Sequence, residues 1–177
     1  MGNFDQQLSS WQPFFMTMAA VCATFAGLLF LALSLHIHEF AEATKVNLKR
    51  LAMHTFADFM LTLFIAVFCL IPHMDHKLLG TMLIVLTLVG FAQLRKPFIE
   101  ALRDKDFTQH RGHFFIRLGI SLLAHLLIII GAVAMLQNVD ITVIDYWLLI
   151  FAGSIALLVS ATRNSWYLLT HELGSKK

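Results

Sequence analysis

Charged residues and cysteines are scarce in this chain of 177 residues. Asp, Glu, Lys and Arg make up 14% of it, whereas an ordinary soluble domain has about 25%. Cys22 and Cys69 lie in apolar stretches and form neither a CxxC pair nor a Cys/His ligand pattern, so we expect small buried side chains. A phosphate loop and a nucleophile paired with its base are also missing. We therefore expect no enzyme and no cofactor.

Apolar residues are correspondingly abundant. They make up 58% of the chain, and the mean hydropathy is +0.74, which is too apolar for a soluble fold of this size. A hydrocarbon core about 30 Å thick needs about 20 apolar residues per helix. The sequence predicts an all-α, polytopic transmembrane helical bundle, a single domain over residues 1–177 in a lipid bilayer. Its five predicted spans are about 14–36, 51–71, 78–94, 114–136 and 146–162.

Particular residues mark the predicted ends of these spans. Trp11 suits the aromatic belt at the membrane surface, and Pro13 suits the start of the first helix. Pro72 follows the second span. The fifth span has apolar residues beyond it, so its helix is expected to continue toward Leu169.

The basic residues give the expected orientation. Of thirteen Lys and Arg residues, only Lys77 falls on one side of the alternation that the spans create. The positive-inside rule then places the N-terminus outside and the C-terminus in the cytoplasm. Since the basic residues flank membrane spans, they indicate orientation and no nucleic-acid partner. No basic segment precedes Phe14, and the first span is too long for a signal peptide, so we expect it to be retained.

The longest segment between spans is 95–113, on the predicted cytoplasmic side. The spacing of Phe98, Ile99 and Leu102 fits a short amphipathic helix on the membrane surface, and a solvated connector fits equally well. Histidines on this side could bind a metal or respond to pH, but the i, i+2 spacing of the first two argues against a shared helix face, and we expect no metal site. These histidines are His36, His38, His110 and His113.

Small residues recur along the first span. Ala19, Ala23 and Gly27 stand four residues apart, which is the pattern that lets two membrane helices pack closely. The partner helix could belong to the same chain or to another subunit. Gly80, Gly90 and Gly153 extend this expectation of close packing to the third and fifth spans.

Two ionisable residues lie deep within predicted spans. Asp58 is seven residues past Leu51, or about 10 Å along a helix, and His125 is eight residues past Arg117, or about 12 Å. An ionised side chain facing lipid is costly, so we expect both to face the bundle interior and each other. Each shares a helix face with polar neighbours at a spacing of four. These faces are His54, Asp58 and Thr62 in the second span, and Arg117, Ser121 and His125 in the fourth.

Three interpretations of these residues stay open. Asp58 could accept hydrogen bonds from His125 or from nearby hydroxyl groups, and these bonds could hold the helices together without further function. Alternatively, the residues could line a hydrated proton or ion pathway, since intramembrane carboxylate and imidazole groups mark such pathways. A b-type haem could bind at His125, with Met60, Met82 or a second subunit supplying the other ligand.

Both ends of the chain resemble a known family. The segment AAVCATFAGLLFLALSL, from Ala19 to Leu35, and RNSWYLL, from Arg163 to Leu169, are similar to small uncharacterised bacterial multi-span inner-membrane proteins. That family has a Gly-Leu-x-Phe-x-Ala-x-Ser-Leu first helix and an Asn-x-Trp-x-Leu-Leu ending. A weaker likeness lies at Leu70, Ile71 and Pro72. The resemblance implies a multi-pass protein of the bacterial inner membrane, with no established activity and no functional residues to carry over.

These observations lead to three hypotheses. The first is a channel-like or transport-related homo-oligomer with a proton or ion pathway through His54, Asp58, Thr62, Ser121 and His125. The second is a non-catalytic subunit or regulator that binds another membrane protein through the first helix. The third is the haem electron carrier.

Overall fold

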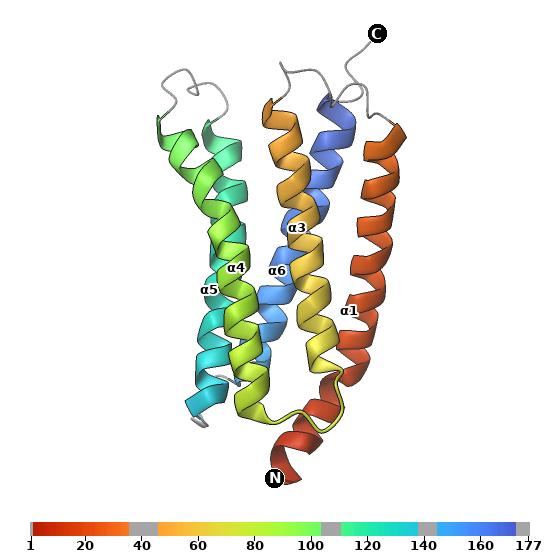
Figure 1. Ribbon diagram of the computed structural model, residues 1–177, viewed down its shortest axis with the longest axis vertical. Helices are drawn as coiled ribbons and strands as arrows, with labels where there is room; N and C mark the ends of the chain where they lie inside the picture. Colours follow the sequence, from red (N-terminus) through yellow and green to blue (C-terminus); the bar gives the residue numbers. More distant parts are fainter. Residues whose placement is uncertain (1, 36–45, 104–110, 138–144, 173–177) are drawn as a thin grey trace.

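The computed structural model describes residues 2–35, 46–103, 111–137 and 145–172, and every regular element in this part of the chain is helical. The helices run alongside one another as an upright bundle (Figure 1). The predicted all-helical bundle is therefore confirmed. Its α-helices are α1 (Gly2–Leu35), α3 (Val46–Cys69), α4 (His76–Arg103), α5 (Arg111–Gln137) and α6 (Tyr146–Tyr167), and a π-helical turn (Leu168–Glu172) follows α6.

The helices have the length and composition that a bilayer requires. Four of them contain apolar segments long enough to cross, namely Phe4–Leu35, Leu51–Cys69, Gly119–Gln137 and Tyr146–Thr170. The apolar part of α4, His76–Ala92, is shorter, as the sequence predicted for the third span. The chain is thus a multi-span membrane protein. Helix α1 begins at the lower end of the bundle and α6 ends at the upper end (Figure 1).

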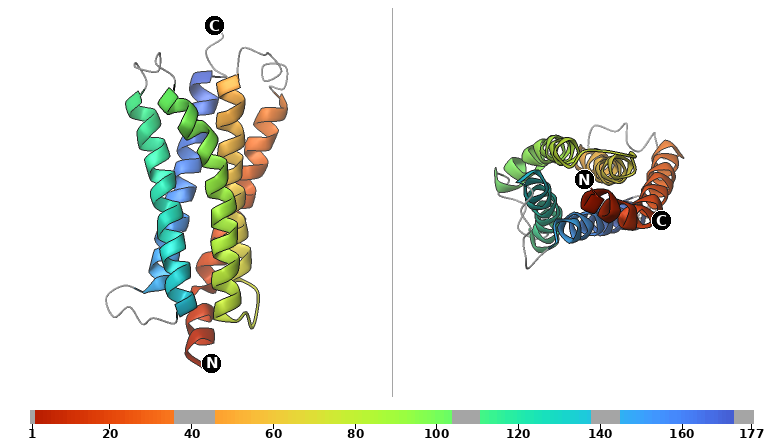
Figure 2. Two further views of the ribbon diagram at one scale, coloured as in Figure 1. Left: turned by 60° about the vertical axis from the view of Figure 1, so that its left-hand side comes forward. Right: turned by 90° about the horizontal axis from the view of Figure 1, so that it is seen from below.

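Helix α1 begins earlier than the sequence predicted. It starts at Gly2 and contains Pro13, so the interpretation of Pro13 as the start of the helix is wrong. Tertiary contacts explain the difference: Leu8 is buried at 3% exposure, and Phe4 stacks on Trp147 of α6 with ring centroids 5.8 Å apart. Proline removes one backbone hydrogen bond and bends a helix. The turns before Pro13 cross beneath the bundle (Figures 1 and 2).

Two other helices are longer than their apolar segments. Helix α4 does not end at Leu94 but continues through Pro97 to Arg103, so residues 95–103 of the predicted loop are helical. Residues 104–110 of that loop lie outside the described residues, and the expected surface helix stays a prediction. The expected continuation of the fifth span to Leu169 is confirmed, because the π-helical turn directly follows α6.

The order of packing places α1 at the edge of the bundle. Helix α3 packs against α1, α4 and α6, and α5 packs against α4 and α6, whereas α1 meets α6 mainly through side chains of its lower part, such as Phe4 and Phe15 against Trp147 (Figure 2). Helices α3, α4, α5 and α6 therefore enclose one interior. The lower end of this interior, as seen in Figure 1, is covered by the first turns of α1.

Glycines allow the closest helix contacts. A Cβ atom on Gly153 of α6 would lie 2.6 Å from Cγ1 of Ile128 and 2.9 Å from the carbonyl oxygen of Ala124 on α5. A Cβ atom on Gly80 of α4 would lie 3.0 Å from the carbonyl oxygen of Ala132. The close packing that the sequence predicted at these glycines is present, because any side chain would push the helices apart.

Candidate functional site

Polar side chains are buried inside the bundle on four of its helices. In the described part of the chain, nine polar residues are less than 5% exposed. Buried polar groups in native proteins are nearly always hydrogen-bonded, so each of these needs a partner. They are Thr55, Asp58 and Thr62 on α3, Thr87 on α4, Ser121 and His125 on α5, and Ser154, Ser160 and Asn164 on α6.

The polar face of α3 centres on an acid and an imidazole. Asp58 is 4% exposed, and its Oδ2 atom lies 3.3 Å from Nδ1 of His54, one helical turn above it. Thr62 donates its hydroxyl hydrogen to the backbone carbonyl of Asp58 at 2.8 Å, and Thr55 does the same to Leu51. The threonines are therefore satisfied within their own helix. His54 is the one described side chain placed against the carboxylate of Asp58.

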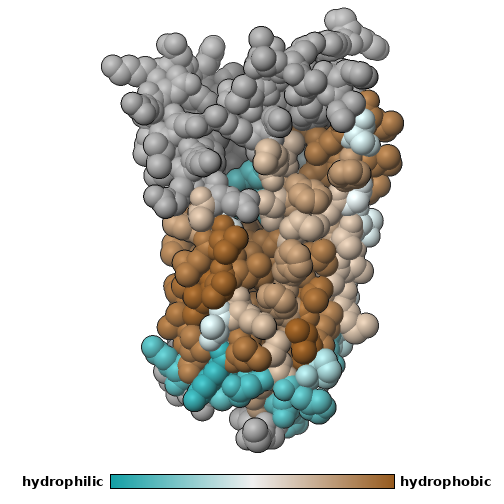
Figure 3. Space-filling view, in the orientation of Figure 1, coloured by the Kyte–Doolittle hydropathy of each residue, from teal (hydrophilic) through white to brown (hydrophobic). Residues whose placement is uncertain are grey.

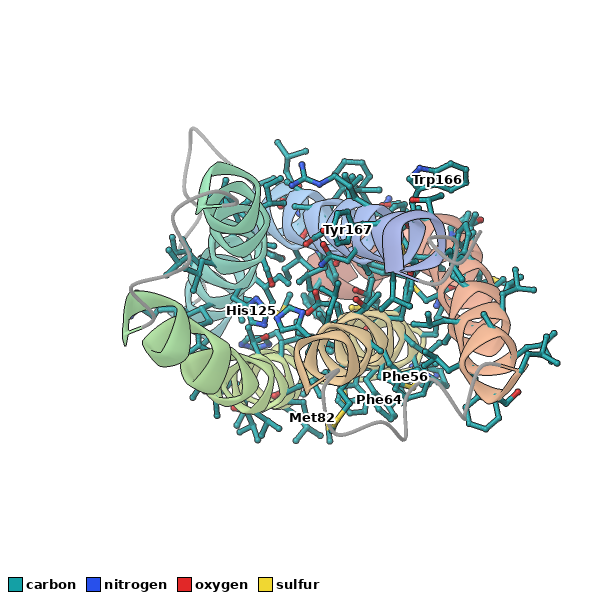
Figure 4. The ribbon with its side chains drawn as sticks, turned by 90° about the horizontal axis from the view of Figure 1, so that it is seen from above. Phe56, Phe64, Met82, His125, Trp166 and Tyr167 are labelled. Carbon is teal, nitrogen blue, oxygen red and sulfur yellow. The ribbon has the colours of Figure 1, made fainter. Side chains whose placement is uncertain are left out.

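His125 points from α5 into the interior and is completely buried (Figure 4). Its Nδ1 atom lies 2.7 Å from the backbone carbonyl oxygen of Ser121. Since a carbonyl oxygen can only accept, the imidazole carries a hydrogen on Nδ1, and in the neutral ring Nε2 is an acceptor. A Cβ atom on Gly90 of α4 would lie 3.0 Å from that Nε2 atom. Glycine at this position leaves room for the imidazole.

The structure brings the ionisable residues of α3 and α5 into one region. Gly90 lies against both Leu61 of α3 and His125 of α5. His125 of α5 and Asp58 of α3 are both buried in this interior. However, Nε2 of His125 and Oδ2 of Asp58 each lack a hydrogen-bond partner, so they do not bond to each other. The two residues share the interior without the direct hydrogen bond that the structural interpretation proposed.

Seven buried polar atoms in this region, these two included, have no hydrogen-bond partner among the described residues, although Oδ2 of Asp58 lies 3.3 Å from Nδ1 of His54. Leaving such an atom unsatisfied costs about 1–3 kcal/mol, and a cluster of them indicates that water or a ligand supplies the missing bonds. On α3, α5 and α6 these atoms are Nε2 of His54, Oδ2 of Asp58, Oγ of Ser121, Nε2 of His125, Oγ of Ser160, Oδ1 of Asn164 and Oγ of Ser165. We call the region formed by His54, Asp58, Ser121, His125, Ser160 and Asn164 the upper interior.

The α6 members of this region were not identified from the sequence. Ser160 and Asn164 are 2% and 3% exposed, and they stand four residues apart on the face that α6 turns inward. The same spacing marks His54 and Asp58. A search for neutral polar pairs at this spacing, in addition to ionisable ones, would have found them.

Below the upper interior the side chains are apolar and aromatic. We call this region the lower interior and define it by residues that are fully buried: Phe15, Leu79, Ile128, Trp147 and Ile150. Rings from α1 and α6 pack across it, with centroids of Phe15 and Trp147 6.1 Å apart. The hydroxyl of Tyr146 donates a hydrogen bond of 2.7 Å to Oε1 of Gln7. These contacts close the lower end of the bundle.

A metal or haem site receives no support from the described side chains. Within the described residues no three His, Cys, Asp or Glu side chains come together in a way that could hold a metal ion. The side chains of His36, His38, His110, His113 and Arg117 lie outside the description. Met82 points from α4 away from the interior (Figure 4), and half-buried Met60 packs in the cluster with Phe59 and Ala161. Neither methionine is placed as a second haem ligand opposite His125.

The small-residue face of α1 is only partly covered by the described chain, since Ala19 packs against the hydrophobic core. No atom lies within 4 Å of a Cβ position on Gly27; Ala23 is exposed and Ala19 is half-buried. The packed face of α1 instead carries Phe15, Met18, Cys22, Ala26 and Leu29. Whether this face packs within the chain or against another subunit therefore stays a prediction. As expected, both cysteines are buried and unpaired.

Comparisons with protein-family models, with curated proteins and with solved structures return no match to this chain. The resemblance of its two ends to a bacterial family therefore stays an expectation. Functional argument must start from the interior of the bundle.

Proposed function

We propose that this protein is a transport-related membrane protein that carries protons or small ions through the upper interior. The observation that supports this proposal is the cluster of buried, unpartnered polar atoms contributed by α3, α5 and α6. Helices held together only by packing have no need of such atoms, since each one destabilises the fold unless it is hydrated or bound. Carboxylate and imidazole groups inside a membrane are typical of proton and ion pathways.

Each ionisable residue has a role in this proposal. Asp58 supplies the negative charge that attracts a cation or accepts a proton. His54, whose Nδ1 atom lies 3.3 Å from Oδ2 of Asp58, is the neighbouring group that relays the proton. His125 presents its Nε2 acceptor one helix away. The lower interior is closed by Trp147 and Phe15, so the described conformation corresponds to a closed pathway. The proposal assigns no catalysed reaction to the chain.

Flux through reconstituted protein tests this function. Asp58→Asn removes the charge while preserving the shape of the side chain, and we expect proton or cation flux into liposomes to fall at least tenfold. Asp5→Asn is the matched control, because Asp5 is exposed in the first turns of α1. Native flux should also change between about pH 5 and 8, where imidazole groups titrate. The absence of any flux from the native protein under a membrane potential would remove this function.

The peripheral position of α1 favours a second candidate function. Because Ala23 and Gly27 are exposed and small, another helix could approach α1 closely, either from a second copy or from a different membrane protein. The protein would then be a homo-oligomer or a non-catalytic regulatory subunit. Gly27→Leu should reduce the particle mass measured by light scattering in detergent without lowering the thermal stability of the chain. An unchanged particle mass would contradict this candidate.

We further propose that the protein lies in a bacterial inner membrane with its C-terminus in the cytoplasm. The distribution of Lys and Arg supports this orientation. A reporter fused after Lys177 should be active in the cytoplasm, and a tag placed before Met1 should be accessible from the periplasm. Detection of both ends on one side of the membrane would contradict the assignment.

A further inference from the structure

We infer that the upper interior is a hydrated chamber with access from the upper end of the bundle, that Ser160 and Asn164 complete its wall, and that it holds water and the protons carried by water instead of a dehydrated metal cation. The proton-carrying part rests on the proposed function. The hydration of the chamber does not, because it follows from polar atoms that need partners whether or not anything is transported.

The first argument concerns the chemistry of the unpartnered atoms. Oδ2 of Asp58 and Oδ1 of Asn164 can only accept hydrogen bonds, and Nε2 of His125 also accepts in the neutral ring. None of these three acceptor atoms has a hydrogen-bond donor among the described residues. Water supplies two donors and two acceptors, and a buried water usually makes about three hydrogen bonds. The serine hydroxyls of Ser121 and Ser160 can donate or accept as such waters require.

The second argument places these residues at the same depth. Phe59 packs with Ala161, and these two residues directly follow Asp58 and Ser160 in the sequence. One or two turns higher, Ala52 packs with Leu168. Asp58 of α3 therefore faces the level of Ser160 of α6, and His54 faces the level of Asn164. A rise of about 1.5 Å per residue puts His54 about 12 Å below Val46, the first residue of α3.

The third argument concerns where the chamber opens. Asn164 lies three residues before the end of α6, and Tyr167 at that end points inward (Figure 4). Toward the lower end, the hydroxyls of Thr87 and Ser154 bond to carbonyl oxygens of their own helices. Below them lie the mostly apolar side chains of the lower interior, in which Nε1 of Trp147 is the one unpartnered polar atom among the described residues. Because the lower end is closed, the inferred water must enter the chamber from the upper end.

The fourth argument concerns the ion. The buried residues in the described chain include a single carboxylate, Asp58, and it lies beside His54. No group of three metal-binding side chains is present among the described residues. Metal cations that lose their water need six or more oxygen ligands in the case of Ca²⁺, or rigid octahedral geometry in the case of Mg²⁺. A proton needs only a chain of hydrogen bonds, which waters between Asp58, His54 and His125 can form.

Cysteine accessibility tests the hydration without relying on transport. In a Cys22→Ala, Cys69→Ala background, Ser160→Cys should react with sulfonatoethyl methanethiosulfonate added on the upper side of the membrane. We expect labelling at least ten times faster than that of the native Cys69, measured in a protein that retains it, because Cys69 is completely buried near the lower end. Reagent added on the lower side should not label Ser160→Cys. Ile150→Cys, in the lower interior, should be as slow as Cys69.

A second cysteine position keeps the test valid if the first variant does not fold. If Ser160→Cys fails to elute as a single species in size-exclusion chromatography, Asn164→Cys in the same background replaces it with the same expected labelling. Labelling of the upper position no faster than that of Cys69 would overturn the hydrated chamber. Equal labelling of Ile150→Cys would overturn the closed lower end.

Flux measurements test whether the transported ion is a proton, and they distinguish the proposed transport function from the hydration of the chamber. Asn164→Leu should lower proton flux at least tenfold, whereas Thr162→Val, which changes a half-buried hydroxyl bonded within α6, should not. A sodium gradient without a pH gradient should drive no flux. Sodium flux without proton flux would overturn the choice of ion. Rapid labelling of Ser160→Cys together with no flux of any ion would overturn the proposed function and the choice of ion but support the hydrated chamber.

Discussion

The lower end of the bundle interior is lined mainly by apolar side chains and the upper end by polar ones, although the same helices form both. Helix α6 contributes Trp147 and Ile150 to the lower interior and Ser160 and Asn164 to the upper interior. The lower side chains fill space at high packing density, and their van der Waals contacts stabilise the fold. The upper side chains leave polar atoms without protein partners, which lowers stability unless water is present. The side chains that fill the core and the residues of the proposed pathway therefore lie in different halves of one helix bundle.

The outer surface supports the same comparison. Hydrophilic surface gathers at the lower end of the bundle, with an apolar belt above it (Figure 3). Exposed Asp5, His73, Asp75, Lys77 and Asp145 lie in the lower loops and the first turns of helices. Asp145 caps α6 by accepting a hydrogen bond of 3.0 Å from the backbone of Trp147. The lower end is thus solvated outside while its interior stays apolar, as a sealed membrane surface requires.

The largest expected effect comes from creating a cavity in the lower interior. Trp147→Ala removes a completely buried ring that packs against Phe4 and Phe15, and it should destabilise the fold by about 3–5 kcal/mol. Trp166→Ala is the matched control on the same helix, since Trp166 is 68% exposed and its loss leaves no cavity. Thermal unfolding in detergent measures both. Equal losses of stability would contradict the assignment of the lower interior as the stabilising half.

The next effect separates glycines in contact from a glycine on an open face. Gly153→Ala places a methyl group 2.6 Å from Ile128 and should destabilise the fold by about 1–3 kcal/mol, because α5 and α6 must separate. Gly27→Ala should preserve or slightly raise stability, because the methyl group meets no atom and alanine favours helix. The comparison uses the same unfolding measurement. A larger loss for Gly27→Ala than for Gly153→Ala would contradict the packing described here.

A smaller effect distinguishes a hydrated upper interior from a dry one. If Oδ1 of Asn164 had no partner at all, Asn164→Leu would relieve an unsatisfied group and raise stability by about 1–3 kcal/mol. In a hydrated chamber the amide is already satisfied, and we expect the free energy of unfolding to change by less than about 1 kcal/mol. A large gain in stability would show that the upper interior is dry.

The sequence was sufficient for the fold class and for much of the interior of α3 and α5. The lengths of the apolar stretches predicted the helices because a bilayer demands about 20 residues per crossing. Asp58 and His125 were placed inward because an ionisable group in lipid is costly, and both are buried. Their role in transport stays a proposal, since burial alone is compatible with more than one function.

Other features depended on contacts between residues distant in the sequence. Pro13 suggested a helix start, but packing of Phe4 against Trp147 keeps the preceding turns helical. The stripe containing Gly27 suggested a packed face, yet small residues form the same pattern whether a face meets lipid or protein. Neutral Asn164 gave no electrostatic reason to face inward. Only the arrangement of the helices decides these three cases.

The smallest expected effect concerns the bond that holds the first turns of α1 below the lower interior. Polar hydrogen bonds within membrane proteins contribute about 0.6 kcal/mol on average, so Tyr146→Phe should destabilise the fold by about that amount through loss of its bond to Gln7. Gln7→Leu removes the same bond from the other side. If the contact is formed in solution, the double variant should lose less stability than the two single losses combined, because the second change removes nothing further. Strict additivity in this cycle would show that Tyr146 and Gln7 act independently, and that the first turns of α1 are held by the Phe4 and Leu8 contacts alone.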